Sequence, residues 1–297
     1  MISRLADAFR ETVSGDKSGA PKWVQQIRDY STPGLFSSDS TVWEIHGSVS
    51  TLIGGIRALL LQAAHPAALT GVMQHSRYQE DLMGRLQGTS RWLTLTTFGS
   101  KELIEAEARR VNAMHSRVQG NFHDKQGVDR EYRASNERFL LWVHCAFTES
   151  FLEAHRICRY PLKGTFDRYV AEWSKSAEPL GLTNAPQSEA ELTATITDFL
   201  ENELNYTDAT KEVVGFILKP PFSLLARIFY KPLAYTAVRS LSDAERQLLK
   251  LKQPSVFWEH VARFNLWALR TALGSYSPAQ QAAMDRESKR NGGDEEI

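Results

Sequence analysis

Helical periodicity is the feature that most constrains the fold of this chain. Apolar residues recur at intervals of three and four along most of its length, and stretches that alternate with period two are scarce. This spacing gives each segment one apolar face, so the sequence predicts an all-α fold. Ser100, Ser188 and Ser242 precede acidic first-turn residues and predict helix starts, whereas Gly99 and Gly120 predict helix ends. The expected helices span residues 40–64, 66–75, 80–97, 101–119, 135–158, 163–177, 188–204, 221–229, 231–238, 242–250 and 254–272.

The organisation along the chain indicates one multi-helix domain. The 297 residues contain no repeat of fixed period and no linker long enough to divide them. We therefore expect the domain to span residues 21–285. Residues 1–20 are polar and contain glycine, which predicts a flexible N-terminal segment, and the polar C-terminal sequence, which includes SKRNGGDEEI, predicts a disordered tail over residues 286–297.

The charge and the cysteine content limit which binding partners and which cellular compartment we expect for this protein. The chain has 35 basic and 35 acidic side chains, so its net charge gives no general reason to expect nucleic acid or an anionic membrane as partner, although local patches are left open. The two cysteines, Cys145 and Cys158, do not form a metal-binding pair or a disulfide framework. The N-terminus lacks the pattern of a secretory signal, and we expect a cytoplasmic protein.

Two apolar stretches raise the question of a membrane. The stretch from Val49 to Met73 is interrupted by Arg57 and by His65-Pro66, so we expect buried helices rather than a membrane span. The second stretch, residues 213–238, carries three basic residues and three prolines. We favour a bent segment that caps the core, and peripheral contact with a membrane surface stays open as the alternative.

Several common catalytic motifs are missing from the sequence. No G-x-G-x-x-G or Walker-type loop points to a nucleotide fold, and no G-x-S-x-G elbow points to a serine hydrolase. H-E-x-x-H is absent, and so is Glu-x-x-His, from which helical di-iron proteins build their site. A helical protein that has inward histidines without these pairs suggests a different cofactor.

His115 lies on the apolar face of its helix. Ile104, Ala108 and Val111 precede it at helical intervals, while most polar neighbours, Glu107 among them, lie elsewhere around the helix. A lone inward histidine is usually structural and is satisfied by a backbone carbonyl or a hydroxyl. The alternative is a haem ligand, because one proximal imidazole can hold haem iron without a second ligand at fixed spacing.

Three other histidines fall on or near apolar faces. His144 and His155 share one face of the helix predicted over 135–158, and the structural interpretation applies to each of them. His65 precedes Pro66, where one helix should end and the next begin. We favour a capping role for its imidazole, with a position at the edge of a cofactor as the alternative.

Arg85 and Thr89 form a second candidate surface. They are one helical turn apart, and Trp92 and Thr96 continue the same stripe. The arginine could pair with a haem propionate or steady a polar intermediate, and the threonine could donate a hydrogen bond to a ligand. The alternatives are a surface salt bridge or cap for Arg85 and a hydrogen bond within its own helix for Thr89.

Four segments in this order resemble one known family. They are LLLQAAHPAALTGVMQHS, DLMGRLQGTSRWLTLTTFG, EARRVNAMHSRVQG and LLWVHCAFTESFLEAHR. Together they resemble the catalytic domain of the MpaB-type oxygenases and rubber oxygenases (latex clearing proteins), over about residues 40–270. The resemblance implies an all-α fold with a globin-like core, a b-type haem and oxidative cleavage of carbon–carbon double bonds in isoprenoid-like chains by dioxygen.

The resemblance also implies roles for individual residues. His115 would be the proximal iron ligand, Arg85 and Thr89 would lie in the distal pocket, His144 would lie near the haem, and His65 would lie at its periphery. Some rubber oxygenases carry a lysine just before the distal threonine, whereas this chain has Gly88 there, which implies an open or water-bound sixth position.

A second departure concerns the catalytic base. A glutamate proposed for that role in rubber oxygenases should precede the arginine, but residues 45–79 contain no Asp or Glu. This departure argues against base-assisted cleavage of rubber.

Three functional hypotheses follow. The first is a haem-dependent oxygenase, an oxidoreductase that acts with dioxygen on a hydrophobic, unsaturated small molecule. The second is a haem-binding sensor or carrier without turnover. The third is a haem-free helical module that binds a lipid or terpenoid. The sequence leaves the oligomeric state open.

Overall fold

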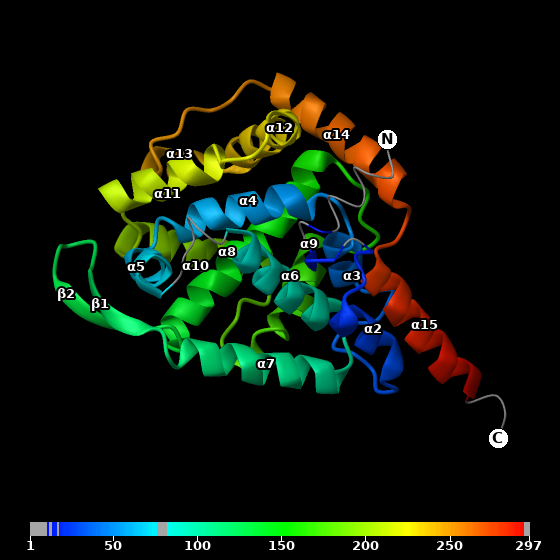
Figure 1. The fold of residues 1–297 in the computed structure, drawn as a ribbon. Helices are drawn as coiled ribbons and strands as arrows, with labels where there is room; N and C mark the ends of the chain where they lie inside the picture. The colour runs from blue at the N-terminus through cyan, green and yellow to red at the C-terminus, as the bar shows by residue number, and fades with distance from the viewer. Residues whose placement is uncertain (1–10, 12–13, 17, 76–81, 294–297) are drawn as a thin grey trace.

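The computed structural model describes residues 11, 14–16, 18–75 and 82–293, and its secondary structure is almost entirely helical (Figure 1). The predicted all-α class is confirmed. The elements in this part of the chain are α2 (Lys22–Asp29), α3 (Thr41–His46), α4 (Thr51–Gln62), α5 (Pro66–His75), α6 (Leu82–Phe98), α7 (Lys101–His115), β1 (Gln119–His123), β2 (Asp129–Arg133), α8 (Glu137–Cys158), α9 (Phe166–Ser174), the 3₁₀ helix η1 (Glu178–Leu180), α10 (Glu189–Asn202), α11 (Asp208–Leu218), α12 (Leu224–Ser240), α13 (Asp243–Leu248), α14 (Phe257–Leu273) and α15 (Pro278–Gly293).

Helices α4 and α8 form the centre of the molecule. Both carry many fully buried apolar side chains, such as Ile53 and Leu60 on α4 and Trp142 on α8. The two helices approach closely at Gly54, where a Cβ atom would lie 2.6 Å from the Phe151 ring and 3.0 Å from a backbone oxygen of α8. This crossing therefore requires glycine, and the rest of the fold packs around it.

The other helices cover this central pair on several sides. In Figure 1, α12, α13 and α14 lie above α4, while α6 lies below α4 and α7 runs along the lower edge. Helix α3 packs on α6 and α9, and α15 packs on α2 and α6. The hairpin of β1 and β2 projects beside α5.

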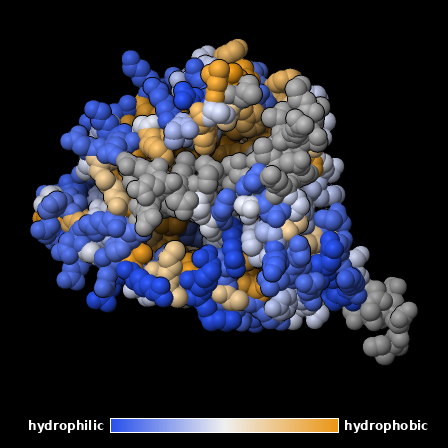
Figure 2. All heavy atoms as spheres, viewed as in Figure 1, coloured by the Kyte–Doolittle hydropathy of each residue, from blue (hydrophilic) through white to orange (hydrophobic). Residues whose placement is uncertain are grey.

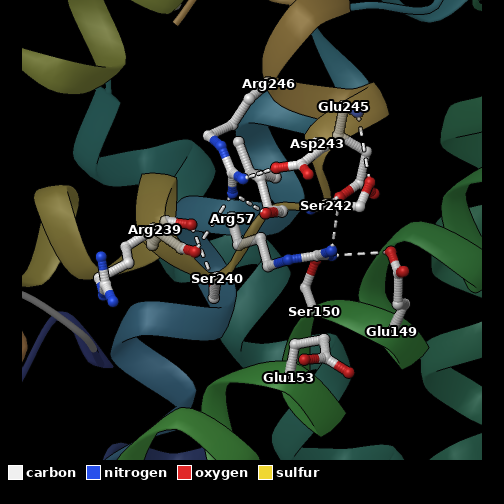
Figure 3. Close-up of polar contacts among 12 residues, drawn as sticks. Arg57, Glu149, Ser150, Glu153, Arg239, Ser240, Ser242, Asp243, Glu245 and Arg246 are labelled. Atoms are coloured by element: carbon white, nitrogen blue, oxygen red, sulfur yellow. Dashed lines mark hydrogen bonds and ion pairs between the residues drawn. The ribbon is translucent and has the colours of Figure 1, made fainter. Parts of the chain in front are cut away.

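A buried ion cluster joins α4, α8 and α13 (Figure 3). Arg57 is 1% exposed and donates from Nη1 to Glu149 Oε2 (2.8 Å) and Ser150 Oγ (3.1 Å), and from Nη2 to Glu245 Oε2 (2.8 Å). Burial, together with repulsion from Glu245, raises the pKa of Glu149 to about 7 against the opposing effect of Arg57. The arginine that interrupts the apolar stretch thus anchors three helices rather than facing solvent.

The helix ends show which predictions were right. The predicted capping residues Ser100, Ser188 and Ser242 each accept a hydrogen bond from the backbone of the first turn. The predicted helix 40–64 is wrong as one unit, because α3 and α4 are separated at residues 47–50. Ser48 lies in this break and its carbonyl accepts from the Thr51 hydroxyl, a local bond that competes with the helix.

Helix α12 is continuous where we predicted two helices. Pro232 lies inside it, and the carbonyl that loses its hydrogen bond belongs to Ile228, which is 63% exposed and accessible to water. Helices α2, α11 and α15 were not predicted. Helix α15 crosses the boundary placed at residue 285, and its Arg286 is buried and donates to the carbonyls of Ile27 and Phe98.

The predicted helix 101–119 ends earlier, at His115. The chain then forms an antiparallel hairpin, with Gly120 paired to Tyr132 and a turn at Gly127, whose φ of +80° favours glycine. The short strands were missed because five residues of alternation are a weak signal. Gly120 therefore lies within a strand rather than at the end of a helix, and the prediction that it ends a helix is wrong.

Within the described residues, no single helix is long and apolar enough to cross a membrane. One bent pair, Thr51–Gln62 with Pro66–His75, passes the test of length and composition at an angle of 100°. Most residues of α4 are buried in the core, as expected for the first apolar stretch. In the second stretch, Leu233 and Ala237 are buried, whereas Leu224 and Ile228 are exposed.

Candidate functional site

His115 is the last residue of α7. The inner face of this helix is formed by Ile104, Ala108 and Val111, all buried as predicted. The imidazole is half-buried, and its Nδ1 atom is shielded from solvent and has no hydrogen-bond partner. Burial lowers the pKa of His115, so the ring is neutral at pH 7. A neutral imidazole with a free nitrogen is the form that binds a metal.

A buried carboxylate fixes α7 against α6. Glu107 is 2% exposed and accepts hydrogen bonds from Arg91 of α6 (3.0 Å) and Arg110 of α7 (2.6 and 3.0 Å). The placement of Glu107 outside the apolar face was therefore wrong, because two guanidinium groups compensate its burial. This contact holds the helix of His115 and the helix of Thr89 in one arrangement.

Arg85 and Thr89 lie one turn apart on α6. The side chain of Arg85 lies outside the described residues, so its predicted role stays a prediction. Thr89 is exposed, and a side chain at Gly88 would meet nothing within 4 Å. Thr96, two turns beyond Thr89, is fully buried and its Oγ1 has no partner. The stripe thus runs from the exposed Thr89 to the buried, unpaired hydroxyl of Thr96.

His144 projects from α8 toward α9. Its ring stacks on Trp173, with the centroids 6.4 Å apart and the planes 11° from parallel. Its Nε2 is buried without a hydrogen-bond partner, and burial lowers the pKa of the ring to about 4. His144 is neutral at pH 7 and, like His115, retains a nitrogen free to bind.

His46, which no sequence pattern singled out, also contacts Trp173. Its Nδ1 bonds Thr97 Oγ1 and its Nε2 bonds Tyr169 Oη, both at 2.9 Å. The ring lies 4.3 Å from that of Trp173, and burial lowers the pKa of His46 to about 3. His46 is thus a fully satisfied neutral histidine that joins α3, α6 and α9. The sequence gives one local hint of its position: Gly47 follows it directly, as at the end of a helix.

His65 does not cap the helix break that precedes Pro66. The ring is 1% exposed, and its Nε2 lies 3.2 Å from Glu203 Oε2. It packs on Trp142, which lies about 160° around α8 from His144 at roughly 100° per residue. His65 and His144 therefore face opposite sides of α8, and the structure does not bring them together.

Glu203 is itself held in place by Arg138. The guanidinium Nε donates to Glu203 Oε1 at 2.6 Å. Burial raises the pKa of this carboxyl, but the hydrogen bonds and charges of His65 and Arg138 outweigh that effect and lower it overall. His65 thus contacts an ionised carboxylate, and one of its nitrogens, Nδ1, remains unpaired and buried.

His155 is the one candidate whose environment matches the structural interpretation. Its Nε2 lies 3.2 Å from the carbonyl oxygen of Pro161, and Tyr160 packs on its ring edge-on. All four candidate histidines have one buried ring nitrogen without a partner, but in His65 and His155 the other nitrogen contacts a protein group. No ring or hydrogen-bond contact joins His115 to His144 directly.

The donor set fits a cofactor that needs one protein ligand. Within residues 18–75 and 82–293, no three His, Cys, Asp or Glu side chains gather into a metal site made of protein ligands alone. Haem requires only one axial imidazole, and His115 offers a neutral ring with an unpaired nitrogen. Figure 2 shows a recess with hydrophobic residues in its depth, in the region where Figure 1 places α5, α6 and α7.

Comparison with known protein families shows which family this chain belongs to. A family model described as ER-bound oxygenase mpaB/B'/Rubber oxygenase, catalytic domain, matches residues 43–274. The chain belongs to this family. The match contains α4 to α14, and hence every predicted site residue. No curated protein and no solved structure matches the chain, so the globin-like core stays a prediction from the resemblance.

Proposed function

We propose that this protein is a haem-dependent oxygenase in which His115 binds the iron of haem b. The substrate is a hydrophobic, unsaturated, isoprenoid-like small molecule that reacts with dioxygen. Membership in an oxygenase catalytic-domain family supports the reaction class. The observation that carries the haem assignment is the neutral, half-buried imidazole of His115 at the C-terminal end of α7, whose Nδ1 has no partner.

A bound haem supplies the redox chemistry that activates dioxygen, and the polypeptide supplies orientation and exclusion of water. The contact between Glu107 and Arg91 fixes α7, and so the direction of His115, relative to α6. His144 stays neutral on the Trp173 ring, and its free Nε2 provides a hydrogen-bonding position in an apolar surround. We assign Arg85 and Thr89 of α6 to the distal side of the haem pocket, across from His115. There the guanidinium of Arg85 would pair with a haem propionate.

The substrate is selected mainly by shape. Gly88 leaves space beside Thr89, and residues 45–79 supply no carboxylate to act as a base. These features favour a smaller apolar substrate over rubber. Zero net charge argues against nucleic acid as a partner. We place the protein in the cytoplasm, because Cys145 and Cys158 are both free and buried.

Absorption spectroscopy tests the haem assignment. The purified protein should show a Soret band that shifts on reduction. The His115→Ala variant should bind about one tenth as much haem per chain, or less. His123→Ala is the matched control, because His123 lies exposed on the hairpin and pairs with the exposed Asp129. A His115→Ala variant that keeps the full, unchanged Soret band would overturn the ligand assignment.

Oxygen consumption separates turnover from binding alone. The haem-loaded protein should consume dioxygen when a panel of short isoprenoids is added, with products that carry new carbonyl groups. A protein that binds haem but consumes no dioxygen with any of them is the sensor or carrier of the second hypothesis. A folded protein without a Soret band that still binds a terpenoid is the haem-free module of the third.

A further inference from the structure

Large apolar side chains stand exposed on α12 and α14. Leu224 and Ile228 of α12 are 73% and 63% exposed, and Phe264 and Trp267 of α14 are 63% and 61% exposed. In Figure 2, hydrophobic residues are visible at the upper rim of the molecule, where Figure 1 places these helices. Side chains of this size are rarely exposed together unless they form a contact surface.

The two helices form one continuous face. Asn265 of α14 donates to the carbonyl of Phe229 on α12 at 3.5 Å, and the rings of Tyr235 and Trp258 lie 5.0 Å apart. The later residue of α12, Tyr235, thus contacts the earlier residue of α14, Trp258. The helices are therefore antiparallel, and the first turns of α12 lie beside the second half of α14. The exposed residues of both helices therefore belong to one surface.

This face is strongly basic although the chain as a whole is neutral. Helices α12 and α14 contain five arginines and lysines and a single acidic residue, Glu259. Glu259 is 6% exposed and pairs with Arg239 and Arg159. No carboxylate in the part of the chain that the structure describes lies within ion-pair distance of Arg263 or Arg270. The outer surface of α14 thus carries positive charge that the protein does not neutralise.

A cavity of about 430 Å³ opens between α14 and the chain at the end of α8. Its lining includes Arg263 and Arg270, which project from α14 two turns apart, and Tyr160 beyond the end of α8. Phe264 and Trp267 form its apolar side. An unneutralised guanidinium beside exposed aromatic rings matches an amphiphile, whose anionic group pairs with arginine while its apolar part contacts the rings.

We propose that α12 and α14 form a docking surface for an anionic phospholipid membrane, with lipid phosphates at Arg263 and Arg270 and with Phe264 and Trp267 at the interface. A second copy of the chain fits less well, because it would bring the same positive charges against this face. Nucleic acid would leave the exposed apolar side chains unexplained. Basic residues that flank exposed Trp, Phe and Leu side chains are the composition of helices that lie on a membrane.

Vesicle binding tests the proposal with the full-length protein. Binding should be stronger to vesicles that contain phosphatidylglycerol than to phosphatidylcholine alone, and should weaken as salt is raised. The double variant Arg263→Gln/Arg270→Gln should bind the anionic vesicles about 30-fold more weakly. The control Lys289→Gln/Arg290→Gln removes the same charge from exposed positions on α15 and should bind like the original protein. An equal loss in the control, or no preference for anionic vesicles, overturns the proposal.

Fluorescence tests the aromatic contact independently of charge. The tryptophan emission should shift to the blue on anionic vesicles, and Trp267→Phe should lose most of that shift. Trp267→Ser combined with Phe264→Ser should weaken binding by about ten-fold or more. Two outcomes point to other occupants and overturn the proposal: inorganic phosphate alone saturating the site and preventing vesicle binding, or a dimer in solution that the same substitutions dissociate.

Discussion

Two groups of buried polar side chains differ in what their atoms bind: the charged groups around Arg57 bind one another, whereas His115 and His144 are neutral rings, each with one unpaired nitrogen. Around Arg57, one guanidinium binds two carboxylates and a hydroxyl and joins three helices. Around His144 and His115, neutral rings sit among apolar groups with nitrogens that have no partner. An unpaired buried polar atom destabilises a fold, and a neutral imidazole nitrogen is one that a bound ligand can satisfy. Under the proposed function, the Arg57 cluster holds the helices together and the two neutral rings mark where a ligand binds.

Removal of Arg57 should have the largest effect on stability. Arg57→Ala leaves Glu149 and Glu245 without their common partner, which for a buried pair costs about 3–5 kcal/mol in the free energy of unfolding. Urea denaturation at pH 7 measures this change. Arg130→Ala is the control, because Arg130 is 61% exposed in its pair with Asp124 and its loss should cost under about 1 kcal/mol. Equal losses in the two variants would remove the distinction between the regions.

Acidification should act on the two regions in opposite directions. His46 and His144 have folded pKa values of about 3 and about 4, below their unfolded value, so the unfolded chain binds more protons below pH 6.5. Their contribution to stability is present above pH 6.5 and falls with pH, by up to about 1.4 kcal/mol per pH unit for each ring. Glu149, with a pKa raised to about 7, binds its proton more readily when folded, so its contribution rises as pH falls from 7 toward 4.5.

The variant Glu149→Gln separates these opposing effects. It removes the carboxyl whose protonation stabilises the fold on acidification and leaves the histidines unchanged. The free energy of unfolding should therefore decrease more steeply between pH 7 and pH 5 in this variant than in the original protein. Parallel curves for the two proteins would show that Glu149 does not titrate as a buried carboxyl.

The same contrast shows how far the sequence could predict the molecule. Local signals were sufficient for the class of fold, for the serine caps and for the buried face of α7, because each depends on residues within about one or two turns. Glu107 and His46 were misplaced or missed because their partners are distant or belong to another helix. His46 binds Thr97 and Tyr169, which are 51 and 123 residues away. Periodicity could place His115 inward, but only the packed structure shows that its Nδ1 is unpaired.

Two adjacent threonines of α6 provide the finest comparison. Thr97 Oγ1 bonds His46, whereas Thr96 Oγ1 is equally buried and has no partner. Thr97→Val should lower the free energy of unfolding by about 1–2 kcal/mol, because it leaves a buried imidazole nitrogen unpaired. Thr96→Val should leave the stability unchanged or raise it slightly, since it removes an unsatisfied hydroxyl and preserves the shape.

Urea denaturation of the apoprotein measures both variants, and the haem spectrum then distinguishes their roles. If the unpaired hydroxyl of Thr96 faces a ligand, Thr96→Val should alter the Soret band or the haem affinity without loss of stability. Thr97→Val should instead change stability and leave the spectrum unchanged, because its hydroxyl is already used within the protein. Equal destabilisation by both substitutions would mean that Thr96 has a structural partner in solution, and the contrast between satisfied and unsatisfied polar groups would no longer locate the site.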